Sequence, residues 1–132
     1  MSHTVKIQTK FTQLNPLKKA FEHFGWNIVE NAKAKTYPND PRQNEVYAYV
    51  AKNPQTSSNN YDVGIKVGAN GEVEVHCDFY GGSIAQTLGN NLDKLRGEYA
   101  YRVIEEKYAY EGASVFREMK EDGSMEVTVD AQ

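Results

Sequence analysis

Two runs of alternating apolar residues with a glycine-containing turn between them constrain this chain more than any other feature. Every second residue is apolar along residues 63–67 and again along residues 73–79. This period of two is typical of strands that bury one face and expose the other. The pattern therefore predicts an antiparallel hairpin over residues 63–79.

The length of the turn sets the register of this hairpin, because directly opposed residues of an antiparallel pair share a face. A two-residue turn would set Val67 against Glu74 and mismatch the two apolar rows. A three-residue loop over residues 69–71, with Gly71 in the left-handed region, instead sets Val67 against Val73. We therefore predict the three-residue loop, with Ile65 opposite Val75 in the next pair on that face.

The same arithmetic applies near the C-terminus. A three-residue loop over residues 121–123, with its glycine in the left-handed region, pairs Met119 with Met125 and Val115 with Val129. Both hairpins are thus expected to use the same turn. A negative φ at these glycines would contradict the register.

Periodicity also predicts the elements before the first hairpin. Residues 4–11 alternate in polarity and are expected to form a strand. An amphipathic helix is expected from Asn15 and Pro16 to Gly25, since asparagine and proline are favoured at the first positions of helices. A second strand is expected from Trp26 to about residue 36, followed by a loop.

Residues 46–50 are apolar on both faces and are the best candidate for a central strand. Alternation places Val46 and Val50 on one side of the sheet and Tyr47 and Tyr49 on the other. The polar segment that follows, over residues 53–60, reads as a loop.

The second helix is expected to begin at the capping-box sequence over residues 83–86 and to end at Gly112. Gly89 and Gly97 each weaken it by about 1 kcal/mol relative to alanine, so the helix is expected either to break or to start late, near Asn90. The order β-α-β-β-β-β-α-β-β predicts an α+β fold. We expect a single antiparallel sheet of about six to seven strands, with two helices packed on one face and the other face open.

Size and composition favour one domain over residues 1–132. Hydrophobic residues make up 39% of the chain and charged residues 25%, a balance that supports a packed core. No membrane span or secretory signal is recognisable, so a cytoplasmic protein is expected. Cys77 is the only cysteine, which excludes an intramolecular disulfide.

Short segments spread over nearly the whole chain resemble a known family. The chain is similar to the "hypothetical chloroplast reading frame" family, short proteins of algal plastids, cyanobacteria, other bacteria and some bacterial viruses, whose members have no agreed activity. Where that family has tryptophans after an aspartate, this chain has Phe79 and Tyr80. The residues that carry the resemblance are Met1-Ser2-His3, Ile7, Thr9, Leu17, Ala20, Gly25, Tyr61-Asp62-Val63-Gly64, Asp78-Phe79-Tyr80-Gly81, Glu98-Tyr99-Ala100 and Asp122-Gly123-Ser124.

The resemblance implies an accessory role. Genes of such bacterial proteins can lie near genes for an ATPase of the AAA class and for a ferredoxin-like protein, which makes these two proteins the partners that the resemblance implies. It also implies the plastid stroma or the cytoplasm of an infected host as alternative locations.

Tyrosine is abundant in this chain, with nine residues. A phenol ring offers a large contact area and a hydroxyl group, and tyrosine is enriched at interfaces. An open sheet face that carries Tyr47 and Tyr49 would dock a partner or stack bases. In the alternative, the rings line the edge of the core with their hydroxyl groups at the surface.

Asp62 and Asp78 face each other in the predicted register of the first hairpin. Two facing carboxylates repel, which raises one pKa or favours a bound cation. In the alternative, one aspartate lies past the end of the ladder and both are solvated.

The chain lacks the sequence patterns of common catalytic and metal sites. It has no phosphate-binding glycine loop of the Walker type, no GxGxxG and no HExxH, and its three histidines are scattered. Cys77 falls in an apolar row and Ser83 reads as a helix cap. We therefore expect a protein that is not an enzyme, with no metal and no cofactor.

Three binding functions stay open. The first is a protein-protein accessory module that presents a tyrosine-rich surface. The second is a small-anion or nucleotide binder that sequesters its ligand, with Tyr61, Tyr80, Tyr101 and Arg102 as wall and clamp. Nucleic-acid binding comes third, because the net charge of −3 is acidic and basic residues are not grouped.

Overall fold

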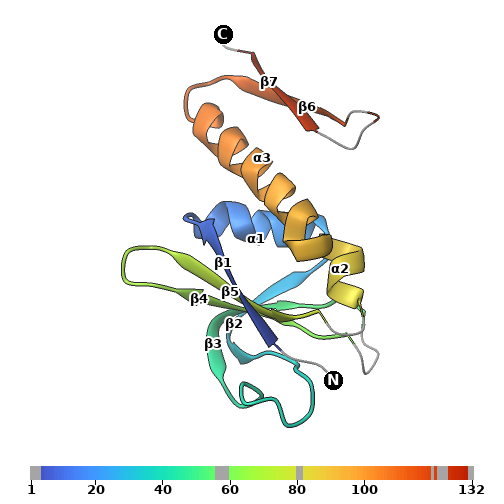
Figure 1. The fold of residues 1–132 in the computed structure, drawn as a ribbon. Coiled ribbons are helices and arrows are strands. Elements are labelled where there is room, and N and C mark those ends of the chain that lie inside the picture. Colours follow the sequence, from blue (N-terminus) through green and yellow to red (C-terminus); the bar gives the residue numbers. More distant parts are fainter. Residues whose placement is uncertain (1–3, 56–59, 80–81, 120, 122–124, 131–132) are drawn as a thin grey trace.

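The computed structural model describes residues 4–55, 60–79, 82–119, 121 and 125–130 (Figure 1). Strands and helices follow one another as β1 (Thr4–Phe11), α1 (Leu14–His23), β2 (Asn27–Lys33), β3 (Val46–Lys52), β4 (Val63–Val67), β5 (Val73–Asp78), α2 (Ser83–Leu88), a 3-10 turn η1 (Asn90–Leu92), α3 (Asp93–Ala109), β6 (Ser114–Met119) and β7 (Met125–Asp130). The fold is therefore α+β.

The strands form two antiparallel sheets. The central one joins β5, β4, β3 and β2, with β1 added along the outer side of β5, and β6 pairs with β7 alone. The predicted single sheet of six to seven strands is wrong. The 17 residues of α3 carry the chain about 25 Å along the helix axis, so the last hairpin forms far from either edge of the central sheet (Figure 1).

Both predicted hairpin registers are confirmed. Val67 lies opposite Val73, with Gly71 at φ +81° in the turn. At the C-terminal hairpin Met119 lies opposite Met125, whereas Gly123 falls outside the described residues. The remaining predicted pairs, Ile65 with Val75 and Val115 with Val129, are also present.

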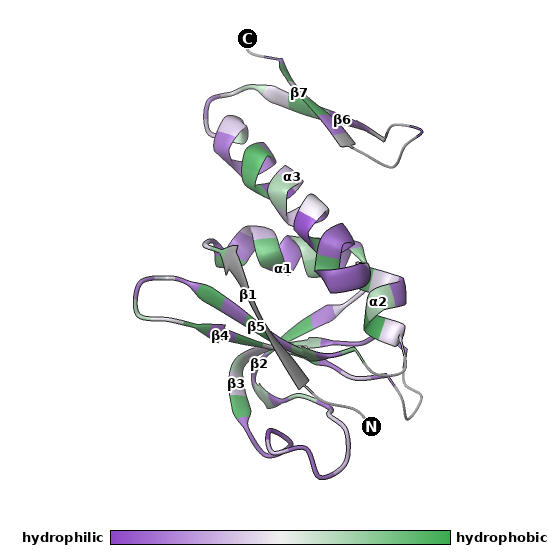
Figure 2. Cartoon of the chain, in the orientation of Figure 1, coloured by the Kyte–Doolittle hydropathy of each residue, from purple (hydrophilic) through white to green (hydrophobic). Residues whose placement is uncertain are grey.

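The main core lies between the central sheet and the helices, which cover the same face of the sheet (Figure 1). Both α1 and α3 carry hydrophobic and hydrophilic residues along their length (Figure 2). The only tryptophan, Trp26, is 1% exposed, and its ring centroid lies 5.9 Å from that of Phe21 on α1. The buried residues of this core also include Leu17, Ala20, Ala51, Val63, Ile65, Val75, Cys77, Ile84, Leu88 and Leu95.

The alternation along β3 breaks between its two tyrosines. Tyr49 and Ala51 contact the main core, whereas Tyr47 and Val50 belong to a second, smaller cluster. The break lies next to Asn31 of β2, whose φ of +50° interrupts the extended backbone. The prediction that both tyrosines share one side of the sheet is therefore wrong.

The second helix is divided near Asn90, where a break was expected, so the chain has one helix more than the predicted order of elements. Gly89 ends α2 at φ +90°, and Leu92, at φ +61°, precedes α3. A Cβ atom at Gly89 would collide with the side chain of Asp93, so glycine is required at this bend. Gly97 lies within α3 and causes no break.

The two long helices are joined at the start of α1. Instead of the predicted Asn15, Gln13 precedes the first turn, and its side chain makes no capping bond. The backbone N–H groups of Thr12 and Gln13 donate to the hydroxyl group of Tyr99 on α3, at 3.0 and 3.2 Å. A side chain from α3 thus satisfies donors that would otherwise lack a partner within α1.

Two glycine-to-alanine substitutions are expected to change stability in opposite directions. A Cβ atom at Gly64 would lie 2.5 Å from the ring of buried Tyr47, so Gly64→Ala should lower the free energy of unfolding by about 1–3 kcal/mol. Gly97 has open space around it, so Gly97→Ala should raise it by about 1 kcal/mol. Urea denaturation of both variants measures the difference, and a Gly64→Ala protein as stable as the wild type would contradict this packing.

Candidate functional site

The structure brings four of the predicted site residues to one small cavity beside the end of β5. Tyr47, Tyr61, Asp62 and Asp78 all line it, and their exposed fractions are between 2% and 7%. The cavity volume is about 10 Å³. This is room for about one water molecule, and pockets for small molecules are larger by a factor of about 30 or more. The four residues are therefore gathered, but not around a ligand-sized space.

Asp62 joins three segments of backbone at this cavity. Its Oδ1 accepts a hydrogen bond from the Asn53 N–H at 2.9 Å. Its Oδ2 accepts from the Lys35 N–H at 2.8 Å and from Lys52 Nζ at 3.2 Å. These donors account for the buried carboxylate and tie together the segments after β2, after β3 and before β4.

The facing aspartates do not form the predicted arrangement. Asp62 lies just before β4 rather than within the ladder, and neither Asp62 nor Asp78 is solvated. Within the described part of the chain, no group of three or more histidine, cysteine, aspartate or glutamate residues is placed to hold a metal ion. The cation hypothesis therefore has no supporting geometry.

The sequence analysis missed a chain of polar side chains on the sheet face that carries Tyr47. The hydroxyl group of Tyr47 lies 3.2 Å from His76 Nδ1, and His76 Nε2 lies 2.5 Å from Glu74 Oε1. Burial, followed by the nearby charge of Glu45, raises the pKa of Tyr47, so its phenol stays protonated. The residue spacing was a usable signal, because Glu74 and His76 share the face opposite the apolar row of β5.

The other four predicted site residues lie elsewhere. Tyr80 falls outside the described residues, and Tyr49 is half-buried on the helix side, where Lys18 Nζ lies 5.3 Å from its ring centroid. Tyr101 and Arg102 lie on α3. Among the described residues, the open sheet face therefore carries no tyrosine surface, because the ring of Tyr47 is sealed against Gly64.

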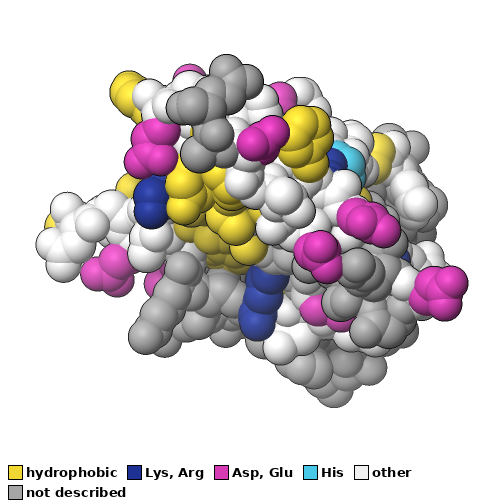
Figure 3. All heavy atoms as spheres, turned by 90° about the horizontal axis from the view of Figure 1, so that it is seen from above, with side chains coloured by type: hydrophobic (Ala, Val, Ile, Leu, Met, Phe, Trp, Pro, Cys, Tyr) yellow, Lys and Arg dark blue, Asp and Glu magenta, His cyan; other side chains and the backbone are white. Residues whose placement is uncertain are grey.

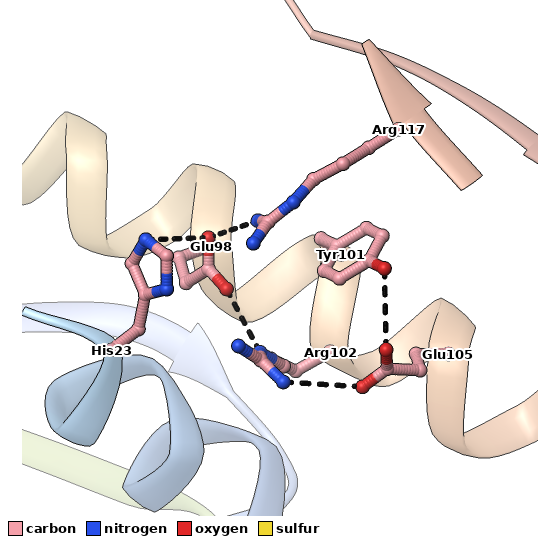
Figure 4. Close-up of polar contacts among 6 residues, drawn as sticks. All are labelled: His23, Glu98, Tyr101, Arg102, Glu105 and Arg117. Atoms are coloured by element: carbon pink, nitrogen blue, oxygen red, sulfur yellow. Dashed lines mark hydrogen bonds and ion pairs between the residues drawn. The ribbon is translucent and has the colours of Figure 1, made fainter. Parts of the chain in front are cut away.

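Glu98, near the middle of α3, is the centre of a second polar cluster (Figure 4). It is 3% exposed, and its Oε2 accepts a hydrogen bond from Arg102 Nε at 2.8 Å. Its Oε1 lies 3.6 Å from His23 Nε2 at the end of α1 and also accepts from Arg117 Nη1 of β6. One buried carboxylate thus links α1, α3 and the last hairpin.

Aromatic contacts and further carboxylates complete this cluster. The guanidinium carbon of Arg117 lies 4.1 Å from the ring centroid of Tyr101, a cation–π contact. Arg102 Nη1 also lies 3.3 Å from Glu105 Oε1. Burial opposes the charge of Arg102, but Glu98 and Glu105 outweigh it and raise its pKa. Because Glu98 and Glu105 already bind this guanidinium, Arg102 is not available for the predicted role of anion clamp.

Beyond this cluster the chain forms a C-terminal arm, defined here as α3 from Arg102 onward together with β6 and β7. Among its described residues none is fully buried. Tyr110 is 93% exposed and Phe116 is 58% exposed. A shallow groove of about 570 Å³ lies between α1 and this part of α3, lined by Lys19, Glu105, Glu106, Ala109 and Tyr110.

Viewed from the hairpin end, hydrophobic side chains gather on the surface with both acidic and basic side chains around them (Figure 3). The hairpin side chains Val115, Val127 and Val129 are only half-buried. A two-stranded hairpin without further cover is marginally stable. The arm is thus the largest part of the described chain that lacks a core of its own.

Comparisons of the chain with protein-family models, with curated proteins and with solved structures return no match. The family resemblance of the sequence therefore stays a prediction. Within the described ranges, no helix combines the length and the apolar character needed to cross a membrane.

Removal of the Asp62 carboxylate is expected to be costly. Asp62→Ala leaves the buried N–H of Asn53 and that of Lys35 without their acceptor, which should lower the free energy of unfolding by about 2–4 kcal/mol. Lys52→Met removes the partly exposed ion pair and an exposed hydrogen bond from Nζ to the Lys33 carbonyl, and it should cost less than about 1 kcal/mol. Chemical denaturation measures both, and equal losses would contradict the backbone role of Asp62.

Cys77 is expected to be unreactive in the folded protein. Burial, and then the charge of Asp78, raise the pKa of its thiol from 9.0 to about 12. The folded state therefore keeps the proton that the unfolded state loses above pH 9, so the contribution of this group to stability is present below pH 9 and declines as pH rises towards 12. Alkylation by iodoacetamide should proceed only as fast as unfolding, and fast labelling of native protein at pH 9 would contradict the burial.

Proposed function

We propose that this protein is a non-enzymatic binding module that uses the C-terminal arm to contact a protein partner. The observation that carries the proposal is the exposure of the arm: large aromatic side chains stand in solvent on a helix end and a hairpin that bury no described residue completely. Aromatic side chains are enriched in the cores of protein interfaces and supply much of their binding energy.

Two features of the arm support a contact role. The groove beside Tyr110 is open and wide, which suits a segment of polypeptide better than an enclosed small molecule. The hairpin is also attached firmly, since Arg117 holds it against α3 through Glu98 and Tyr101. An exposed surface on a fixed support binds with a smaller loss of conformational entropy than a loose segment.

The contact surface thus differs from the one expected from the sequence. Tyr47 and Tyr61 are 2% and 3% exposed, so they stabilise the body of the protein. Tyr110 and Phe116 take the place of the sheet tyrosines as the proposed anchors.

Capture experiments with matched variants test this proposal. The arm variant Tyr110→Ser/Phe116→Ser should lose partners that the wild-type chain captures from its source cell, by about tenfold in recovered protein, because it removes exposed anchors. The control Val46→Ser/Val67→Ser removes two exposed side chains from the central sheet, which are 59% and 42% exposed, and should capture as the wild type does.

Circular dichroism and urea denaturation establish that both variants fold. Two outcomes oppose the proposal: the arm variant retains every partner, or the wild-type chain captures nothing above background. Equal losses in both variants would assign the effect to general surface polarity rather than to the arm.

A further inference from the structure

The groove between α1 and the C-terminal end of α3 is lined by charges of both signs. Lys19 of α1 is exposed and lines it from one side, and Glu106 of α3 lines it from the other. Ala109 adds apolar surface, and Tyr110, which is 93% exposed, borders the same space. Because α3 extends past α1 towards the hairpin (Figure 1), this groove belongs partly to the body and partly to the arm.

The two charges of the groove have no partner within the chain. Among the described side chains, neither Lys19 nor Glu106 forms a hydrogen bond or an ion pair, and Glu106 Oε2 is shielded from solvent without a donor. The neighbouring Glu105 is different, since it already binds Arg102 and the hydroxyl group of Tyr101. A partly desolvated carboxylate without a donor is stabilised by a cation from outside the chain.

The mixture of charges selects among possible occupants. Glu106 repels a nucleic acid or an anionic membrane, and Lys19 repels a uniformly basic segment. A second copy of this groove brings both signs at once. Across a two-fold axis the same patch of each chain meets itself, so Lys19 of each chain can lie against Glu106 of the other.

Tyr110 supplies a protrusion that matches the groove. The groove volume of about 570 Å³ leaves room for the ring of a second chain. A buried aromatic side chain removes about 150–250 Å² from water, so two rings supply about a quarter of a standard interface of about 1,600 Å². The walls of the two helices supply further area, and we expect a dimer that depends on protein concentration.

We propose that the protein forms a two-fold dimer in which Tyr110 of each chain enters the groove of the other and Lys19 of each chain pairs with Glu106 of the other. This inference rests on the proposed function and names the partner of the arm as a second copy of this chain. Phe116 on the hairpin lies outside this contact and stays exposed in the dimer.

Sedimentation velocity of the full chain over a concentration series measures the dimer. The wild type should pass from monomer to dimer as its concentration rises, and added salt should weaken the dimer because it screens the ion pairs. Tyr110→Ser should raise the dissociation constant by about tenfold. The control Phe116→Ser removes a second exposed ring, at 58% exposure, and should dimerise as the wild type does.

Charge reversal identifies the residues that meet across the two-fold axis. Lys19→Glu alone and Glu106→Lys alone should each weaken the dimer by about tenfold, because each sets like charges together in both pairs. An equal mixture of these two variants should form a heterodimer, since opposite charges then face each other in both pairs. The control Lys33→Glu, at an exposed position of β2, should dimerise as the wild type does. Circular dichroism and urea denaturation establish that each variant folds.

Three outcomes overturn the inference: the wild type stays monomeric at every concentration, a control variant loses the dimer as Tyr110→Ser does, or the mixed charge-reversal variants do not associate. Failure of the inference is separable from failure of the proposed function. A monomeric wild type, together with loss of captured partners by Tyr110→Ser/Phe116→Ser, overturns only the self-association. Unchanged capture by that variant contradicts the proposed function itself.

Discussion

The buried carboxylate of Glu98 is the interaction on which the arrangement of the second half of the chain depends. A carboxylate removed from water loses several kcal/mol of solvation unless cations and hydrogen-bond donors replace the water. Here the replacements come from Arg102 on the same helix, His23 on α1 and Arg117 on β6. Loss of any one partner leaves a buried charge less compensated, so the three elements are held together by a shared electrostatic requirement.

The body of the protein uses a second buried carboxylate in a different way. Asp62 is surrounded by backbone N–H groups rather than mainly by cations. It joins the loops that follow β2 and β3 to the segment before β4. Glu98 thus joins helices to a hairpin, whereas Asp62 joins loop backbones to one another. The cavity beside Asp62, at about 10 Å³, is too small for a substrate.

The parts of the fold that sequence reasoning predicted correctly are the local ones. The register of each hairpin follows from the period of two and the length of a short turn, and both pairings of Val67 with Val73 and Met119 with Met125 are present. The number of sheets was not accessible in this way. It depends on where the last hairpin comes to lie, which is decided by contacts between Arg117 and residues of α3 that no periodicity marks.

The candidate site was predicted only as a set of residue types. Tyr47, Tyr61, Asp62 and Asp78 were singled out and do meet at one cavity, but their burial was the reverse of the exposure expected. For Tyr47, the left-handed backbone of Asn31 accompanies the change of face along β3, and alternation cannot anticipate such an irregularity. The exposed side chains of Tyr110 and Phe116, the proposed anchors, were not among the predicted site residues, because solvent exposure is a property of the assembled fold.

The position of Trp26 has a spectroscopic consequence. Its indole is enclosed beside Phe21 between the sheet and α1, and the chain has no other tryptophan. Intrinsic indole emission therefore reports on the interior of the body, while detachment of the distant β-ribbon from α3 leaves that emission unchanged. The two regions of this molecule can be observed independently, one by its own fluorophore and the other only by a label introduced for the purpose.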